Sequence, residues 1–190
     1  MKRLILIISI FFQIGANAQD ANDTYFLKLV NAHRAKNGLG PVKYSKILDG
    51  ASKLQSDYQL AVKKCTHYQE PQLVAASNWF YTAPNRINKV DSTWKDKFNQ
   101  YEIGENVAKW IYAGPVYQPE MKLDTVIVKK LFDAWVASPG HNYSLLLPNA
   151  TVAAFELSST LSYSDNDVLK IRNYTFNLFA TCLLAVELKK

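Results

Sequence analysis

Apolar and polar positions recur with a helical period in the first part of the chain. The spacing of Phe26, Leu29, Val30 and His33 predicts a helix over residues 23–36. Asn22 and Asp23 are available as N-caps of this helix, and Gly38 follows its end. A second run is the clearest amphipathic stripe of the chain, and we expect its face to be core: Ile47, Leu48, Ala51, Leu54, Tyr58, Ala61 and Val62.

A third helix is predicted between Asp124, which would cap it, and the Ser138–Gly140 turn, which would stop it. Residues 66–100 are polar and aromatic and are interrupted by Pro71 and Pro84. This composition predicts long loops with one or two short helices.

The pattern changes near the C-terminus. Residues 151–161 and 171–186 are rich in β-branched and aromatic residues, which predicts two strands, with 162–167 as the hairpin loop between them. Helices followed by paired strands, without repeated strand–helix alternation, favour an α+β sandwich with an antiparallel sheet.

The N-terminus has the three zones of a secretory signal peptide: Lys2 and Arg3, an apolar run from Leu4 to Ile14, and small residues up to Ala18. The apolar run is shorter than the roughly 20 residues needed to span a bilayer. We therefore expect a signal peptide over residues 1–18 and a single domain over 19–190. No later stretch is long and apolar enough for a membrane helix, so the protein is expected to be secreted or periplasmic.

Charge and cysteine content bear on two questions, whether the protein binds nucleic acid and whether it forms a disulfide. The chain has 22 basic and 16 acidic residues, and loss of Lys2 and Arg3 would leave 20 basic residues. The lysines are scattered, without the basic stripe that nucleic-acid binding requires, so we expect no nucleic-acid partner. Cys65 and Cys182 either form one disulfide, which an extracellular location permits, or remain two buried thiols.

Three histidines are available for chemistry. His33 lies on an apolar helix face, where a hydrogen-bonded core role is expected. His67 opens an irregular loop and His141 follows a helix-ending turn, which are positions where folds place functional side chains. Glu105 lies in a compact Gly-Glu-Asn-Val-Ala stretch. If these three side chains converge, they could ligate a divalent metal or transfer protons near neutral pH.

Several motifs occur in a fixed order along the chain: Asn-Ala-His-Arg-Ala at 31–35 with Gly-Leu-Gly-Pro-Val at 38–42, Cys-Thr-His at 65–67, Gly-Glu-Asn-Val-Ala at 104–108, and Trp-Val-Ala-Ser-Pro-Gly-His-Asn-Tyr at 135–143. In this order they resemble the CAP superfamily (cysteine-rich secretory proteins, antigen 5, pathogenesis-related 1) in its bacterial style. The likeness covers nearly the whole chain after residue 25, although residues 69–101 carry no recognisable motif.

The resemblance implies a three-layer α-β-α sandwich with a central, mainly antiparallel sheet. It also implies an extracellular location and a cleft formed by His67, Glu105, Asn106, Ser138 and His141. In many members of the family two histidines and two glutamates hold zinc or a similar cation, which makes His67 and His141 the candidate metal ligands here. Ser138 stands where the second glutamate is expected, and a hydroxyl carries no charge. Two neutral imidazoles and one carboxylate make a weak divalent site unless another ligand completes it.

Three functions follow as hypotheses. The first, which we favour, is a non-catalytic extracellular binding module for a small apolar ligand, a lipid or a protein. The second is a metal-dependent hydrolase or peptidase in which Glu105 positions water and a histidine is ligand or base. The third is an adhesion protein that uses the aromatic segment 79–94 as its working surface.

Overall fold

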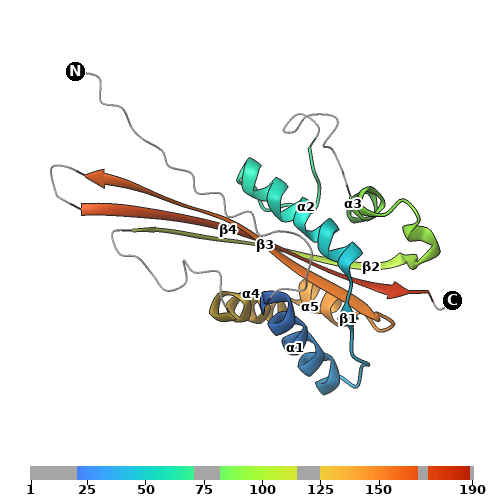
Figure 1. The fold of residues 1–190 in the computed structure, drawn as a ribbon. Helices are drawn as coiled ribbons and strands as arrows, with labels where there is room; N and C mark the ends of the chain where they lie inside the picture. Colours follow the sequence, from blue (N-terminus) through green and yellow to red (C-terminus); the bar gives the residue numbers. More distant parts are fainter. Residues whose placement is uncertain (1–20, 71–81, 115–124, 167–170, 189–190) are drawn as a thin grey trace.

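A computed structural model describes residues 21–70, 82–114, 125–166 and 171–188. The predicted signal peptide and Asp124 lie outside these residues. The described chain forms a four-stranded sheet between two layers of helices (Figure 1). This arrangement confirms the predicted α+β class and the α-β-α sandwich.

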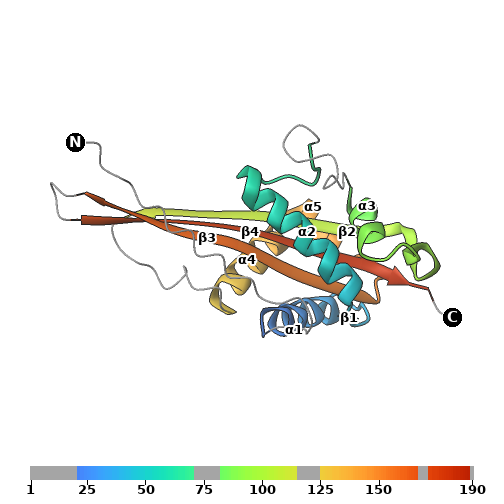
Figure 2. The same ribbon diagram turned by 45° about the horizontal axis from the view of Figure 1, so that its top comes forward.

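Two sets of helices cover the two faces of the sheet, as Figures 1 and 2 show. One layer consists of α1 (Ala21–Lys36), α4 (Thr125–Ala137) and α5 (Pro139–Leu145). The other consists of α2 (Lys46–Val62), α3 (Ala83–Val90) and the 3₁₀ turn Trp94–Asp96. None of the described helices combines the length and apolarity that a bilayer crossing requires.

The strand order in the sheet is β1-β3-β4-β2. The short β1 (Lys43–Tyr44) pairs in parallel with β3 (Val152–Asn166). The strand β4 (Ile171–Glu187) lies between β3 and β2 (Phe98–Gly114) and is antiparallel to both. The far ends of these three long strands extend past the helices (Figure 2).

Each face of the sheet buries its own apolar cluster. On the α1/α4 face, Phe26 stacks on Phe155 at 4.5 Å between ring centroids and meets Trp135 edge-on at 6.1 Å. On the α2/α3 face, Leu48 and Trp94 pack in the cluster that contains Leu183. Because both faces of β4 are covered, its residues 182–185 are all buried, which explains the unbroken apolar run there.

A buried arginine joins α1 to the chain around α5. The Arg34 side chain is fully buried, and its guanidinium donates to four backbone carbonyls, those of Gly40, Leu145, Leu147 and Ala150. The planar guanidinium carries five N–H donors in a rigid fork, so it can donate to several carbonyls at once. A lysine ammonium is a compact charge with only three donors. Arg34 therefore fixes the position of α5, which carries His141.

Sequence periodicity predicted the long helices, but the predictions for the hairpin loop, for the segment after α4 and for the start of α1 differ from the structure. The predicted hairpin loop is wrong over 162–166, because β3 continues to Asn166 by pairing with β4. The Ser138–Gly140 turn ends α4 as predicted, but Pro139 begins a further helix, α5. Helix α1 begins at Ala21, so Asn22 and Asp23 lie inside it and neither is its N-cap.

The predicted core face of α2 is only partly buried. Leu48, Ala51 and Tyr58 are buried, whereas Leu54 and Val62 are half-buried and Ala61 is exposed. Polar residues complete the buried face instead: Asp49, Ser52, Gln55, Ser56 and Gln59. Gln55, Ser56 and Gln59 form hydrogen bonds with the sheet and the neighbouring loop, which the periodicity of apolar residues cannot reveal.

The two cysteines are not joined. Cys182 is fully buried in the middle of β4, and burial raises the pKa of its thiol well above the ordinary value. Cys65 is an exposed free thiol after α2. The sequence left two alternatives, one disulfide or two buried thiols. The structure has two free thiols, of which only Cys182 is buried.

Replacement of Arg34 by methionine should destabilise the fold by about 3 kcal/mol or more, because four backbone carbonyls, two of them in fully buried contacts, lose their charged donor. Urea denaturation followed by tryptophan fluorescence measures the change. Replacement of the exposed Lys36 on the same helix serves as the control and should alter stability by less than about 0.5 kcal/mol. Equal effects of the two substitutions would contradict the proposed role of Arg34.

The arrangement of the thiols predicts a two-step reaction with Ellman's reagent. One thiol per chain, Cys65, should react in the native protein, and a second, Cys182, only after denaturation. The Cys65→Ser variant should show no fast reaction. If the native protein has no reactive thiol, and both thiols appear only after denaturation and reduction, the disulfide forms in solution.

Candidate functional site

The candidate site is built on β2, an edge strand of the sheet. Successive side chains of a strand point to opposite faces. Glu105 is in register with Leu183 and faces the α2/α3 layer, whereas Asn106 is in register with Cys182 and faces the α1/α4/α5 layer. The Gly-Glu-Asn-Val-Ala motif therefore contributes to both sides of the sheet at once.

On the α2/α3 side, Glu105 uses both of its carboxylate oxygens. Its Oε1 lies 3.0 Å from His67 Nδ1, and its Oε2 accepts from Arg86 Nη2. Arg86 Nη1 also donates to the backbone carbonyl of His67 at 3.4 Å. One carboxylate and one guanidinium thus fix both the ring and the backbone of His67.

Arg86 is the functional residue that the sequence reasoning missed. It lies on α3, whose N-terminus carries a reciprocal capping box between Thr82 and Asn85. Its side chain is fully buried and that of Glu105 is 9% exposed. Burial lowers the pKa of the guanidinium, and Glu105 opposes this shift, so Arg86 stays charged at neutral pH. The capping box marks α3 in the sequence, but nothing in the sequence pairs Arg86 with Glu105.

Buried amides hold the segment that carries His67. Gln55 Nε2 donates to the carbonyl of Thr66 at 2.5 Å, and Thr66 N donates to Gln59 Oε1 at 3.3 Å. Gln69 Nε2 in turn donates to Gln55 Oε1 at 3.3 Å. Because Gln55 and Gln59 are one helical turn apart, α2 presents both amides to the same loop. The loop is therefore fixed by side-chain hydrogen bonds rather than by secondary structure.

On the opposite side of β2, the contacts lead to α5. Asn106 Nδ2 donates to the carbonyl of His141 at 3.0 Å, and His141 Nδ1 lies 2.9 Å from Ser138 Oγ. Partial burial and then the nearby imidazole of His67 lower the pKa of His141, so its ring is neutral at pH 7. His33, as predicted, has a structural role: its Nε2 lies 2.7 Å from Asn142 Oδ1.

We call the set His67, Arg86, Glu105, Asn106, Ser138 and His141 the edge site. Five of these residues are the predicted cleft residues. The structure joins His67 directly to Glu105, and His141 to Ser138 and Asn106. Because Glu105 and Asn106 are adjacent on β2, the two groups of contacts meet at one strand, and the imidazole of His67 contributes to the lowered pKa of His141.

The edge site does not fit the divalent cation that the family resemblance implies. Among the described residues, the donor atoms of His67, Glu105 and His141 do not form a group in which all three lie within 4.8 Å of one another, although His67 contacts Glu105. Both Glu105 oxygens are engaged by neighbouring side chains, one of them by a buried guanidinium. A cation would have to displace Arg86 or compete with its full positive charge. Ser138 supplies no compensating carboxylate.

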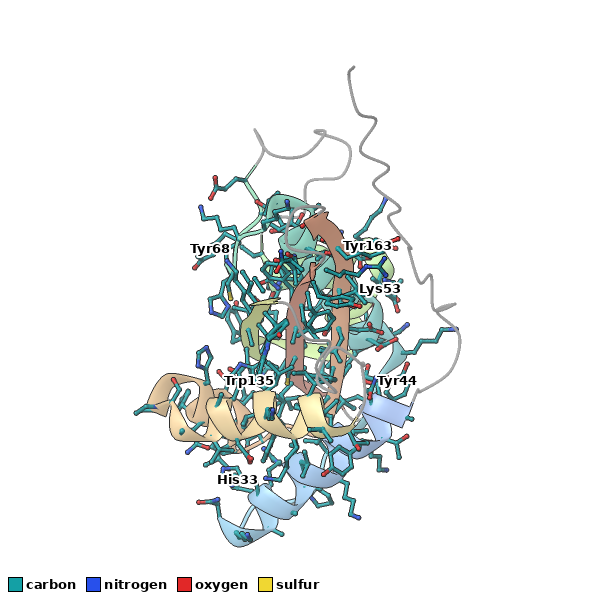
Figure 3. All side chains as sticks on the ribbon, turned by 90° about the vertical axis from the view of Figure 1, so that its left-hand side faces the viewer. His33, Tyr44, Lys53, Tyr68, Trp135 and Tyr163 are labelled. Carbon is teal, nitrogen blue, oxygen red and sulfur yellow. The ribbon has the colours of Figure 1, made fainter. Side chains whose placement is uncertain are left out.

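Aromatic side chains differ widely in exposure around the site. Trp94 is 2% exposed and belongs to the core, so it cannot serve the predicted adhesive surface, while residues 79–81 lie outside the described residues. Tyr68 and Tyr143, by contrast, are 52% and 70% exposed and follow His67 and His141 closely in the chain. Figure 3 shows Tyr68 projecting from the body of the molecule.

Two solved structures are similar to this chain. An outer surface protein from Borrelia burgdorferi matches with a TM-score of 0.50 and 14% identity, covering 96% of this chain and 100% of that one. An extracellular protein containing an SCP domain from Bacillus anthracis str. Ames matches with a TM-score of 0.49 and 19% identity, covering 82% of this chain and 39% of that one. A search of curated proteins found no match.

The family model that matches is that of CAP, the cysteine-rich secretory protein family, over residues 27–174. The match includes every residue of the edge site and most of both helical layers. The chain therefore belongs to the CAP family.

Proposed function

We propose that this CAP protein is an extracellular, non-catalytic binding protein that recognises a protein partner through the edge site and the tyrosines beside it. The predicted signal peptide supports the extracellular location, as does the similarity of fold to an outer surface protein. The observation that carries the proposal is the engagement of both Glu105 oxygens by His67 and Arg86.

This engagement leaves Glu105 poorly suited to activate water. A general base needs an oxygen within reach of the proton that it removes, and a metal ligand needs an unshared oxygen. Here one oxygen faces an imidazole nitrogen and the other a buried guanidinium. Glu105 serves instead to hold His67 in one orientation, so that its other ring nitrogen faces away from the carboxylate. The geometry favours a fixed surface over a hydrolytic centre.

The class of partner follows from what is exposed around the site. The His67 side chain is 45% exposed, and Tyr68 and Tyr143 are more exposed still. Tyrosine combines a large rigid ring with a hydroxyl and is enriched in protein interfaces. Exposed rings and imidazoles suit a protein surface better than an enclosed apolar ligand. Of the predicted partners, we therefore favour a protein over a lipid or a small molecule.

The internal ion pair yields a prediction for stability. Replacement of Arg86 by methionine should cost about 3–5 kcal/mol, because it leaves the Glu105 carboxylate buried without its cation. The double variant Arg86→Met/Glu105→Leu should be more stable than Arg86→Met alone, since it removes the uncompensated charge. Urea denaturation of the four proteins gives the coupling free energy, and additive effects would contradict the pair.

The proposed function can be tested with a displayed peptide library selected against the purified protein. Selected peptides should bind the Tyr68→Ala and Tyr143→Ala variants at least about tenfold more weakly, as expected for interface tyrosines. The matched control is Tyr163→Ala, since Tyr163 is 51% exposed but lies on the extended part of β3. Binding should not depend on added zinc.

Two outcomes would overturn the proposal. Peptides that bind the tyrosine variants as well as the wild type would show that the edge site is not the binding surface. Cleavage of library peptides by the wild type, lost in Glu105→Gln, would show that the site is catalytic.

A further inference from the structure

A second polar cluster lies where α1, α2 and β3 meet, and strand β4 separates β3 from the edge strand β2. Asp23 of α1, Asp49 of α2 and Glu156 of β3 each offer a carboxylate oxygen, and these oxygens lie within 4.8 Å of one another. Asp23 is 2% exposed and Asp49 is 8% exposed, while Glu156 is half-buried. The family resemblance assigns no role to any of them.

The contacts within the cluster fix its geometry. Asp23 Oδ1 accepts from the backbone N–H of Phe155 at 3.2 Å, which turns Asp23 away from the end of its helix and toward the sheet. Asp49 forms side-chain hydrogen bonds with Glu156 and with Tyr44 of β1. Tyr44 and Lys53 lie on the same side of the molecule in Figure 3. Four elements therefore contribute oxygen atoms to one point.

Three mutually close carboxylates cannot all be charged at neutral pH without compensation. Burial, then the carboxylates of Asp49 and Asp23, raise the pKa of Glu156 to about 9. Lys53 also influences Glu156, but its ammonium pairs with Asp57 at 2.9 Å.

Ser52 provides an independent observation at the same place. Its side chain is fully buried, and among the described residues its hydroxyl has no hydrogen-bond partner. It lies one helical turn after Asp49 and one turn before Ser56 on the same side of α2. Asp49 contacts Glu156, and Ser56 contacts Ser158, the next residue on that face of β3. Ser52 therefore lies between two residues of α2 that contact β3, on the buried face that carries Asp49.

We propose that Asp23, Asp49 and Glu156, with the Ser52 hydroxyl, form a binding site for a hard divalent cation, Ca²⁺ above all. Carboxylate and hydroxyl oxygens are the ligands that such cations prefer. Three carboxylate oxygens that are 4.8 Å apart lie about 2.8 Å from their common centre, so small side-chain movements bring all three to the Ca²⁺–oxygen distance of about 2.4 Å. The half-buried Glu156 leaves the ion a route from solvent. The bound cation links α1 and α2 to the sheet.

Calorimetric titration of the full chain with CaCl₂ at pH 7.5, after treatment with a chelator, tests the site. We expect saturable binding of one Ca²⁺ per chain and a rise in the melting temperature.

Charge-neutral variants assign the binding to these residues. Asp49→Asn and Glu156→Gln should each weaken Ca²⁺ binding at least about tenfold. Each substitution replaces a carboxyl group by an amide of nearly the same size, so both variants should fold. The control Asp57→Asn removes an exposed acid from the same helix and should bind Ca²⁺ as the wild type does.

Two results would contradict the cation site. No saturable binding by the wild type, or equal binding by Asp49→Asn, Glu156→Gln and Asp57→Asn, would overturn the site. Glu105→Gln should leave Ca²⁺ binding unchanged, because Glu105 lies on the opposite edge strand of the sheet. The cation site and the proposed function of the edge site can therefore fail independently.

Discussion

The alternation of side chains along β2, held in register by the buried strand β4, is the constraint on which the edge site depends. Pairing of Glu105 with Leu183 and of Asn106 with Cys182 directs these neighbours to opposite faces. A slip of one residue would exchange the two side chains and separate Glu105 from His67 and Arg86. The apolar cores on both faces of β4 oppose such a slip, since it would expose the core side of each strand.

Within this frame, the buried Arg86–Glu105 pair gives the site its chemical character. In many members of the family a bound metal cation neutralises the carboxylates, whereas here the guanidinium of α3 neutralises Glu105. Unlike a metal ion, the Arg86 guanidinium is part of the chain and cannot dissociate. It also has no open coordination position at which water could bind. The result is an orienting network around His67. In such a network the loss of one partner leaves a buried charge uncompensated.

Helix α2 supports both polar networks of the molecule. Near its C-terminal end, Gln55 and Gln59 hold the segment of His67, while near its start Asp49 and Ser52 face β3. Leu48, Ala51 and Tyr58 provide the apolar anchorage between and beside these groups. Hydrogen bonds and charges that are buried against a sheet require exact placement of the helix, because unsatisfied buried polar groups are costly. The polar face of α2 thus links the geometry of the two sites to the packing of one helix.

The sequence by itself determined the α+β class, the extents of α1, α2 and α4, and the family, because these depend on local periodicity and on motifs contiguous in the chain. It also indicated His67, Glu105, Asn106, Ser138 and His141. Only the tertiary structure decided that Glu105 and Asn106 face opposite layers, that Arg86 neutralises Glu105, and that Asp23 turns from a presumed cap toward Asp49 and Glu156. These contacts join residues far apart in the chain, and their partners are chosen by the packing of helices on the sheet, which no local pattern of residues encodes.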